Sequence, residues 1–272
     1  MPDVIIDGHS THYEVDDFAD PWRAADTIWI QHGFGRSSKF WYHWVPLLAG
    51  QYRVLRRDMP GHGRSADPGS DYPWTLEAVL DDMLRFLDAL DLRRVHYVGE
   101  SAGGLFGMAF AARYPDRLKS LILCSSPPIV RKATIDELVK PLGLASQQAA
   151  LDELPMSDFV RNSVKQRMLT AVSSDHVEWL IGEWSKNRSH VLNSLTKLLD
   201  TIDMTPQLGR IKVPTLILAP TRSPIASLAS QRKMARMIPN SELVEIPGVG
   251  HETYVDQAHV CTSAIKSFLE RI

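Results

Sequence analysis

The stretch Gly99-Glu100-Ser101-Ala102-Gly103 decides the fold of this chain. It follows the apolar run 95–98 and precedes small and apolar residues with helical spacing at 105–112. The order is therefore strand, sharp turn, helix. On such a turn, small flanking residues relieve the crowding around a strained serine backbone. The serine hydroxyl then stands at the end of the strand, where the N-terminus of the next helix directs N–H groups toward developing negative charge.

Three further glycine-containing turns each follow a predicted strand: His32-Gly33-Phe34-Gly35, Arg57-Asp58-Met59-Pro60-Gly61-His62-Gly63, and Pro247-Gly248-Val249-Gly250-His251. Together with the serine turn, and in this order, they resemble the α/β-hydrolase family over nearly the whole chain apart from a central insertion. The resemblance implies an α/β fold, with a mostly parallel central sheet and helices on both faces.

The rest of the chain fits this organisation, because predicted strands and helices alternate outside the central segment. We expect an N-terminal hairpin within residues 4–15, a helix over 40–48, an amphipathic helix capped by Thr75, and a C-terminal helix from residue 256. Between residues 127 and 207 the alternation stops and only helical patterns remain.

This central segment resembles the helical cap of many family members. The expected division is a core domain of residues 1–126 and 208–272 and a cap of residues 127–207. A cap lies over the carboxyl ends of the strands, where ligands bind in open α/β sheets, and it excludes water from the pocket. The alternative is a second packing layer that does not contact substrate.

Composition excludes several classes of function. The 272 residues are 44% hydrophobic and 23% charged, which is enough for one large core, and the net charge of −2 gives no electrostatic basis for binding nucleic acid or a membrane surface. Two cysteines imply no disulfide framework, and no signal peptide or membrane-spanning run is evident. No metal cluster or phosphate-binding loop is present in the sequence pattern. We expect a cytoplasmic protein without metal or cofactor, a monomer or small homo-oligomer that acts on a small molecule.

The resemblance assigns chemical roles to specific residues. Ser101 is the candidate nucleophile, and His251, in a tight glycine turn after the last strand, is the candidate general base. The oxyanion hole is expected from the backbone N–H groups of Ala102 and Phe34. The acid that usually completes the triad is missing, because Ser223 and Ser125 occupy the two positions where the family carries it.

Three alternatives therefore remain for the third member. A Ser–His dyad could suffice with a polar partner, since either hydroxyl could accept the imidazole N–H and fix its tautomer. The protein could have drifted to weak catalysis or binding. A carboxylate of the cap could also reach His251, and the candidates are Asp152, Glu153, Asp158, Asp175 and Glu178.

Aromatic residues near the expected oxyanion loop and in the cap suggest the substrate class. Phe34, Trp41 and Trp184 are candidate substrate-binding residues, and they favour a largely apolar or aromatic substrate. The expected function is serine-dependent hydrolysis of a carboxylic ester or lactone through an acyl-enzyme on Ser101. A carbon–carbon bond hydrolase of the meta-cleavage type and a catalytically weak binding protein are the alternatives. Dehalogenation and epoxide opening are disfavoured, because those branches need an Asp where Ser101 stands.

Overall fold

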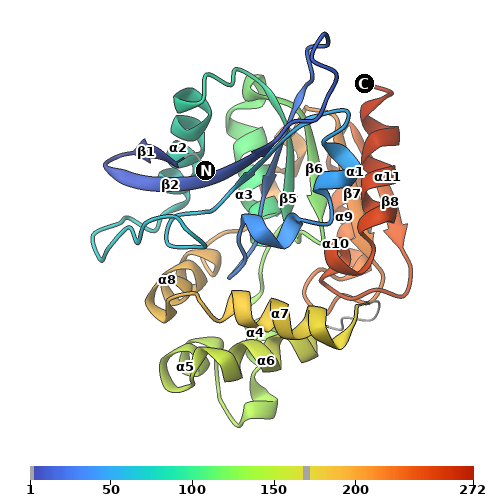
Figure 1. Ribbon diagram of the computed structural model, residues 1–272. Coiled ribbons are helices and arrows are strands. Elements are labelled where there is room, and N and C mark those ends of the chain that lie inside the picture. Colours follow the sequence, from blue (N-terminus) through green and yellow to red (C-terminus); the bar gives the residue numbers. More distant parts are fainter. Residues whose placement is uncertain (1–2, 168–171) are drawn as a thin grey trace.

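The computed structural model describes residues 3–167 and 172–272. Within them the centre is an eight-stranded sheet in the order β1-β2-β4-β3-β5-β6-β7-β8 (Figure 1). The strands are β1 (Asp3–Ile6), β2 (His9–Asp16), β3 (Thr27–Gln31), β4 (Arg53–Arg57), β5 (Val95–Glu100), β6 (Leu118–Cys124), β7 (Thr215–Pro220) and β8 (Ser241–Ile246). The N-terminal hairpin β1–β2 is antiparallel and β2 pairs antiparallel with β4, whereas β4 to β8 pair in parallel. The mostly parallel sheet predicted from the alternation is confirmed.

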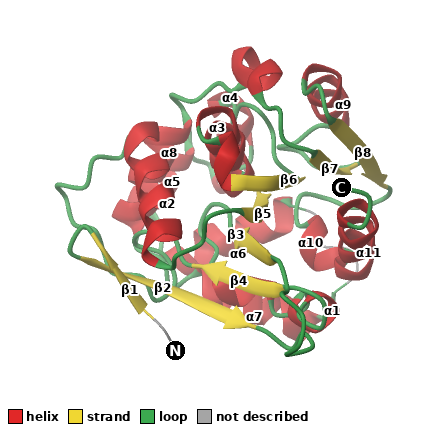
Figure 2. Ribbon diagram, turned by 90° about the horizontal axis from the view of Figure 1, so that it is seen from above, coloured by secondary structure: helices red, strands yellow, loops and turns green. Residues whose placement is uncertain are grey.

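Helices cover both faces of this sheet, which is why the central strands β3, β5 and β7 are buried along their whole length. On one face lie α1 (Val45–Leu48) and α11 (Ala258–Leu269); on the other lie α2 (Leu76–Ala89), α3 (Ala102–Arg113) and α9 (Leu228–Met237) (Figure 2). Every residue of β5 is buried. The parallel strands therefore bring their carboxyl ends, and the turns that follow them, to one edge of the sheet.

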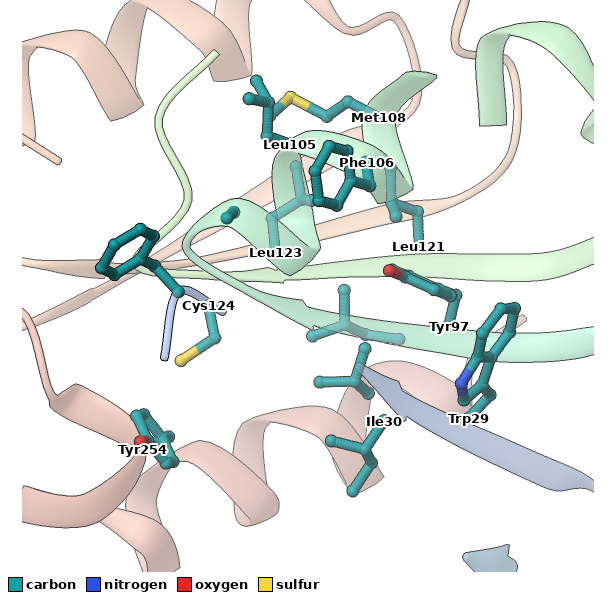
Figure 3. Close-up of a cluster of buried hydrophobic side chains, with 14 of the residues drawn as sticks. Trp29, Ile30, Tyr97, Leu105, Phe106, Met108, Leu121, Leu123, Cys124 and Tyr254 are labelled. Atoms are coloured by element: carbon teal, nitrogen blue, oxygen red, sulfur yellow. The ribbon is translucent and has the colours of Figure 1, made fainter. Parts of the chain in front are cut away.

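Aromatic packing joins β3, β5 and α3 beneath the serine turn. The Trp29 ring meets the Tyr97 ring edge-on, with 5.0 Å between the centroids. The Tyr97 hydroxyl donates a hydrogen bond to the carbonyl of Gly103 over 2.7 Å. Figure 3 shows this buried cluster, with Leu105, Phe106 and Met108 of α3 beside the strands. The first turn of α3 is thus held to the strand that precedes it.

The helix predicted for residues 40–48 is wrong in its extent. The structure has a 3₁₀ turn over Ser38–Trp41 and then the one-turn helix α1. Pro46, in the first turn of α1, cannot donate a backbone hydrogen bond into a preceding turn, so the two pieces stay separate. The Thr75 cap of α2 is confirmed, since its hydroxyl accepts from the N–H of Ala78 over 3.2 Å.

The C-terminal helix predicted from residue 256 is α11, which begins at Ala258, and the short helix α10 (Thr253–Asp256) precedes it. The central segment holds the helices α4 (Lys132–Glu137), α5 (Gln147–Glu153), α6 (Met156–Gln166), α7 (Ser174–Trp184) and α8 (Ser189–Leu199). Figure 1 shows them gathered at the carboxyl ends of the strands. The part of the expected helical pattern at residues 168–171 lies outside the described residues. The domain boundaries at 127 and 207 stay a prediction. No helix in the described ranges is long and apolar enough to cross a membrane.

Candidate active site

Ser101 occupies a strained turn between β5 and α3. Its φ of 51° and ψ of −116° lie in a region that side chains rarely adopt, and such a conformation costs about 1–3 kcal/mol. Close backbone contacts hold the turn in place. A Cβ at Gly103 would come within 2.5 Å of the carbonyl oxygen of Gln31, so only glycine fits there. Strand β3 and the serine turn are therefore in backbone contact, which sets where the hydroxyl stands.

The structure brings His251 to this hydroxyl from the far end of the chain. The Nε2 atom of His251 lies 3.0 Å from the Oγ atom of Ser101, although the two residues are 150 positions apart. His251 is fully buried in the turn between β8 and α10, and its backbone N–H donates to the carbonyl of Arg167 over 3.1 Å. This is hydrogen-bond reach for a nucleophile and a base.

The other ring nitrogen of His251 faces Ser223, not Ser125. The Oγ atom of Ser223, in the turn after β7, lies 3.0 Å from Nδ1. Ser125 instead donates its hydroxyl to the Oγ1 atom of Thr253 over 3.1 Å.

The cap carboxylates do not supply the third group. The side chains of all five candidates are exposed: Asp152, Glu153, Asp158, Asp175 and Glu178. Two of them also have other partners, since Glu178 pairs with Arg161, and Asp152 accepts from the side-chain amide of Asn193. A neutral hydroxyl therefore occupies the place of the acid.

The two residues expected to form the oxyanion hole border the same pocket as Ser101. Ala102 is the first residue of α3, so its N–H has no acceptor within the helix. Phe34 lies in the turn after β3. The preceding N–H, that of Gly33, donates to the Oε2 atom of Glu100 over 3.0 Å. The carboxyl group beside the serine thus anchors the turn that holds Phe34.

A buried charge network, which the sequence analysis missed, surrounds this site. The guanidinium groups of Arg36 and Arg167 both donate to the Oε1 atom of Glu252, the second over 3.3 Å. All three side chains are at least nine-tenths buried. Arg36 also donates to the Tyr254 hydroxyl over 3.2 Å. The sequence did hold a sign of this network, because a charged residue directly follows two of the turns: Arg36 follows the Phe34 turn, and Glu252 follows His251.

The two tryptophans expected in the pocket are packed elsewhere, which corrects that expectation. The ring of Trp184 lies against guanidinium groups, with its centroid 3.4 Å from the Cζ atom of Arg36 and 5.0 Å from that of Arg167. Trp41 stacks on Tyr254 at 4.5 Å between centroids. Neither ring borders the pocket at Ser101, whereas Phe34 does.

Burial and charge set the protonation states in the site. Burial, reinforced by the positive charge of Arg167, lowers the pKa of His251 to about 3. Burial together with the charge of Glu252 raises the pKa of Glu100 to about 8. Although burial opposes it, the two arginines lower the pKa of Glu252 to about 2. At neutral pH, His251 is therefore uncharged and can accept a proton.

Acid is expected to destabilise the protein. Burial lowers the pKa values of His32, His62 and His251 to about 3 each. Below pH 6.5 the unfolded chain binds these three protons and the folded chain does not, so stability falls as the pH drops toward 3, by about 1.4 kcal/mol per pH unit for each histidine. Glu100 has the opposite effect on stability between pH 8 and 4.5. Its raised pKa keeps it protonated only in the folded state, so this one group stabilises the fold as the pH drops through that range.

Urea unfolding at pH 7 and pH 5 checks the prediction. We expect a lower unfolding midpoint at pH 5, and a shallower pH dependence in the variant His62→Gln, which removes one of the three protons. Equal stability at the two pH values would contradict it.

The pocket at Ser101 is small and of mixed character. Its volume is about 30 Å³, against the 300–1,000 Å³ typical of drug-sized ligand sites. Apolar walls come from Phe34, Ile135, Leu199 and Ile225, and polar groups come from Lys132, Asp136, Gln147, Arg167, Thr196 and Asp200. No cluster of metal-ligating side chains occurs among the residues that the structure describes.

Comparison with known proteins gives the same family. The sequence model of the α/β-hydrolase fold matches residues 26–258. The chain is 29% identical, over 89% of its length and 90% of the relative, to a protein named putative carbamate hydrolase RutD from Caulobacter sp. strain K31. It is 24% identical, over 89% of its length and 88% of the relative, to 3-oxoadipate enol-lactonase 2 of Acinetobacter baylyi.

A solved structure extends this similarity to three dimensions. The enol-lactonase from Burkholderia xenovorans LB400 superimposes with a TM-score of 0.85 at 26% identity, and the match covers 99% of this chain and 100% of that one. The strained serine turn, the strand order and these matches agree. The chain therefore belongs to the α/β-hydrolase fold family.

Proposed function

We propose that this protein is a serine hydrolase that cleaves a small carboxylic ester or lactone through an acyl-enzyme on Ser101. The observation that carries the proposal is the 3.0 Å distance between Ser101 Oγ and His251 Nε2, at a strained strand-to-helix turn. The low pKa of His251 supports it, because the imidazole is uncharged at neutral pH.

The proposed reaction has two proton-coupled steps. His251 takes the proton of Ser101 while Oγ attacks the carbonyl carbon, and it then gives that proton to the leaving alkoxide. The N–H groups of Phe34 and Ala102 stabilise the negative oxygen of the tetrahedral intermediate, each by roughly 3 kcal/mol. Water then attacks the acyl-enzyme, with His251 again taking and returning one proton.

The pocket favours a small substrate with polar groups. Its charged lining residues argue against the largely apolar or aromatic substrate that the sequence favoured through Phe34, Trp41 and Trp184. A small carbamate is the second candidate, supported by the polar lining and by the relative named putative carbamate hydrolase. Both candidates pass through the same kind of tetrahedral intermediate on Ser101.

Covalent labelling tests the proposal directly. We expect a fluorophosphonate to form one adduct on Ser101, located by mass spectrometry of tryptic peptides, and to form it much more slowly in the variant His251→Gln. A panel of p-nitrophenyl acetate, short lactones, a methyl carbamate and a vinylogous diketone then identifies the bond that is cleaved. Turnover of the diketone alone would favour the carbon–carbon hydrolase. The absence of both an adduct and turnover would contradict the proposal and favour a binding protein.

A further inference from the structure

The hydroxyl of Ser223 has three hydrogen-bond partners, although its oxygen can accept only two hydrogen bonds. Among the described residues, its Oγ atom lies 2.9 Å from the backbone nitrogen of Ala226, 3.2 Å from that of Ile225, and 3.0 Å from the Nδ1 atom of His251. A backbone N–H only donates, and a serine oxygen has two lone pairs and one hydrogen. The two amides therefore occupy both lone pairs.

The hydroxyl hydrogen of Ser223 is then left for its third partner, the Nδ1 atom of His251. We infer that Ser223 donates its hydroxyl hydrogen to Nδ1 of His251 and so holds the ring in the tautomer that carries its hydrogen on Nε2. This reverses the expectation from the sequence, in which the serine hydroxyl accepts the imidazole N–H. The two amides on Ser223, which come from its own turn, decide the direction of this hydrogen bond.

This tautomer hinders His251 from acting as the general base, a consequence that rests on the proposed function. The Nε2 atom faces Ser101 Oγ at 3.0 Å, and a nitrogen that already carries hydrogen donates to the serine instead of accepting its proton. To become a base, the neutral imidazole must lose the Nε2 proton to water and gain one from water at Nδ1. Ser223 must then accept the new N–H, which requires it to release one amide.

A carboxylate at the same place would not impose this conflict. Its two oxygens only accept, with about four lone-pair sites, so they can take both amides and the imidazole N–H together. In a Ser-His-Asp protease, replacing the acid by an amide lowers kcat about 10⁴-fold, chiefly through the wrong tautomer. Ser223 is thus a positioning residue that favours the unproductive tautomer.

Nitrogen NMR of the unmodified protein tests the inference without any substrate. The ¹⁵N shifts and long-range ¹H–¹⁵N couplings of the ring distinguish a protonated from an unprotonated nitrogen, and the His251→Gln variant assigns the signal among the 10 histidines. We expect hydrogen on Nε2 in the wild type at pH 7. In Ser223→Ala, which removes the donor, we expect a shift toward the Nδ1–H tautomer. Hydrogen on Nδ1 in the wild type would overturn the inference.

Kinetics provide the second readout. We expect Ser223→Asp to raise kcat about 10²-fold, part of the factor that the acid supplies in proteases, and Ser223→Ala to raise kcat by a smaller factor, because it removes the donor to Nδ1 without supplying an acceptor. Ser125→Ala is the matched control and should change neither tautomer nor kcat, since its hydroxyl bonds to Thr253. A fall in kcat in Ser223→Ala would overturn the inference. If the proposed function fails instead, Ser101 takes no fluorophosphonate, while the tautomer can still be read.

Discussion

Replacing Ser101 by alanine is expected to lower kcat by about 10²-fold, because removing the nucleophile costs a serine protease about 10⁶-fold and the unproductive tautomer of His251 already accounts for about 10⁴ of that factor. The reason is chemical: without Oγ no acyl-enzyme forms, and only the oxyanion donors and substrate binding remain. Ser101 is buried with a φ of 51°. Alanine also carries a Cβ and is slightly smaller than serine, so the backbone strain stays the same and the fold should be kept. The measurement is kcat on the best substrate of the panel, with thermal unfolding to verify folding.

Two further variants make this prediction sharper. Ser125 is a matched control, since it is also buried with a φ of 51° at the end of the neighbouring strand β6, and Ser125→Ala should retain full activity. His251→Gln should cost nearly as much as Ser101→Ala, and the double variant should lose little more, because the two side chains act as one unit. Additive losses, or activity retained in Ser101→Ala, would point to a different nucleophile.

The second large effect concerns stability. Glu252→Gln is expected to lower the free energy of unfolding by about 3–5 kcal/mol, because breaking a buried ion pair leaves charge uncompensated. Here two buried guanidinium groups lose their counter-ion at once, since Arg36 and Arg167 share the same carboxylate oxygen. The neutral amide keeps the size of the side chain, so packing stays nearly the same. Urea unfolding at pH 7 measures the change.

The exposed pair Arg232–Glu245 provides the control. Arg232 donates two hydrogen bonds to the two carboxylate oxygens of Glu245. Unlike the Glu252 network, this pair faces solvent, since the carboxylate is 36% exposed and the arginine 52%. Glu245→Gln should therefore cost no more than about 1 kcal/mol. Equal losses in Glu252→Gln and Glu245→Gln would show that the buried network does not depend on its carboxylate.

Local patterns predicted the strands, turns and helices, and the resemblance of four turns to the α/β-hydrolase family predicted the fold. An apolar run followed by a glycine-flanked serine marks a strand, a turn and a helix over adjacent residues, and the same logic applies to the turns that hold Phe34 and His251. The family resemblance paired Ser101 with His251, and parallel strands bring the turns that hold them to the same edge of the sheet. Their separation of 3.0 Å agrees with that pairing, and their catalytic roles remain a prediction.

Side-chain partners were beyond the reach of these patterns. The sequence alone left Ser125, Ser223 and five cap carboxylates open as partners of His251, since none of them is close to His251 along the chain. The tertiary structure selected Ser223 and turned the carboxylates toward solvent. It also moved Trp41 and Trp184 out of the pocket and against Tyr254 and Arg36.

Strand and turn formation depends on neighbours in the chain, so residue order by itself determined the strands, the serine turn and the place of His251 after the last strand. The orientation of the hydrogen bond at Ser223, the shared carboxylate of Glu252 and the small pocket arise where distant segments converge. Only the folded chain sets those distances, because hydrogen bonds and ion pairs depend on separations of a few ångströms that no periodicity encodes.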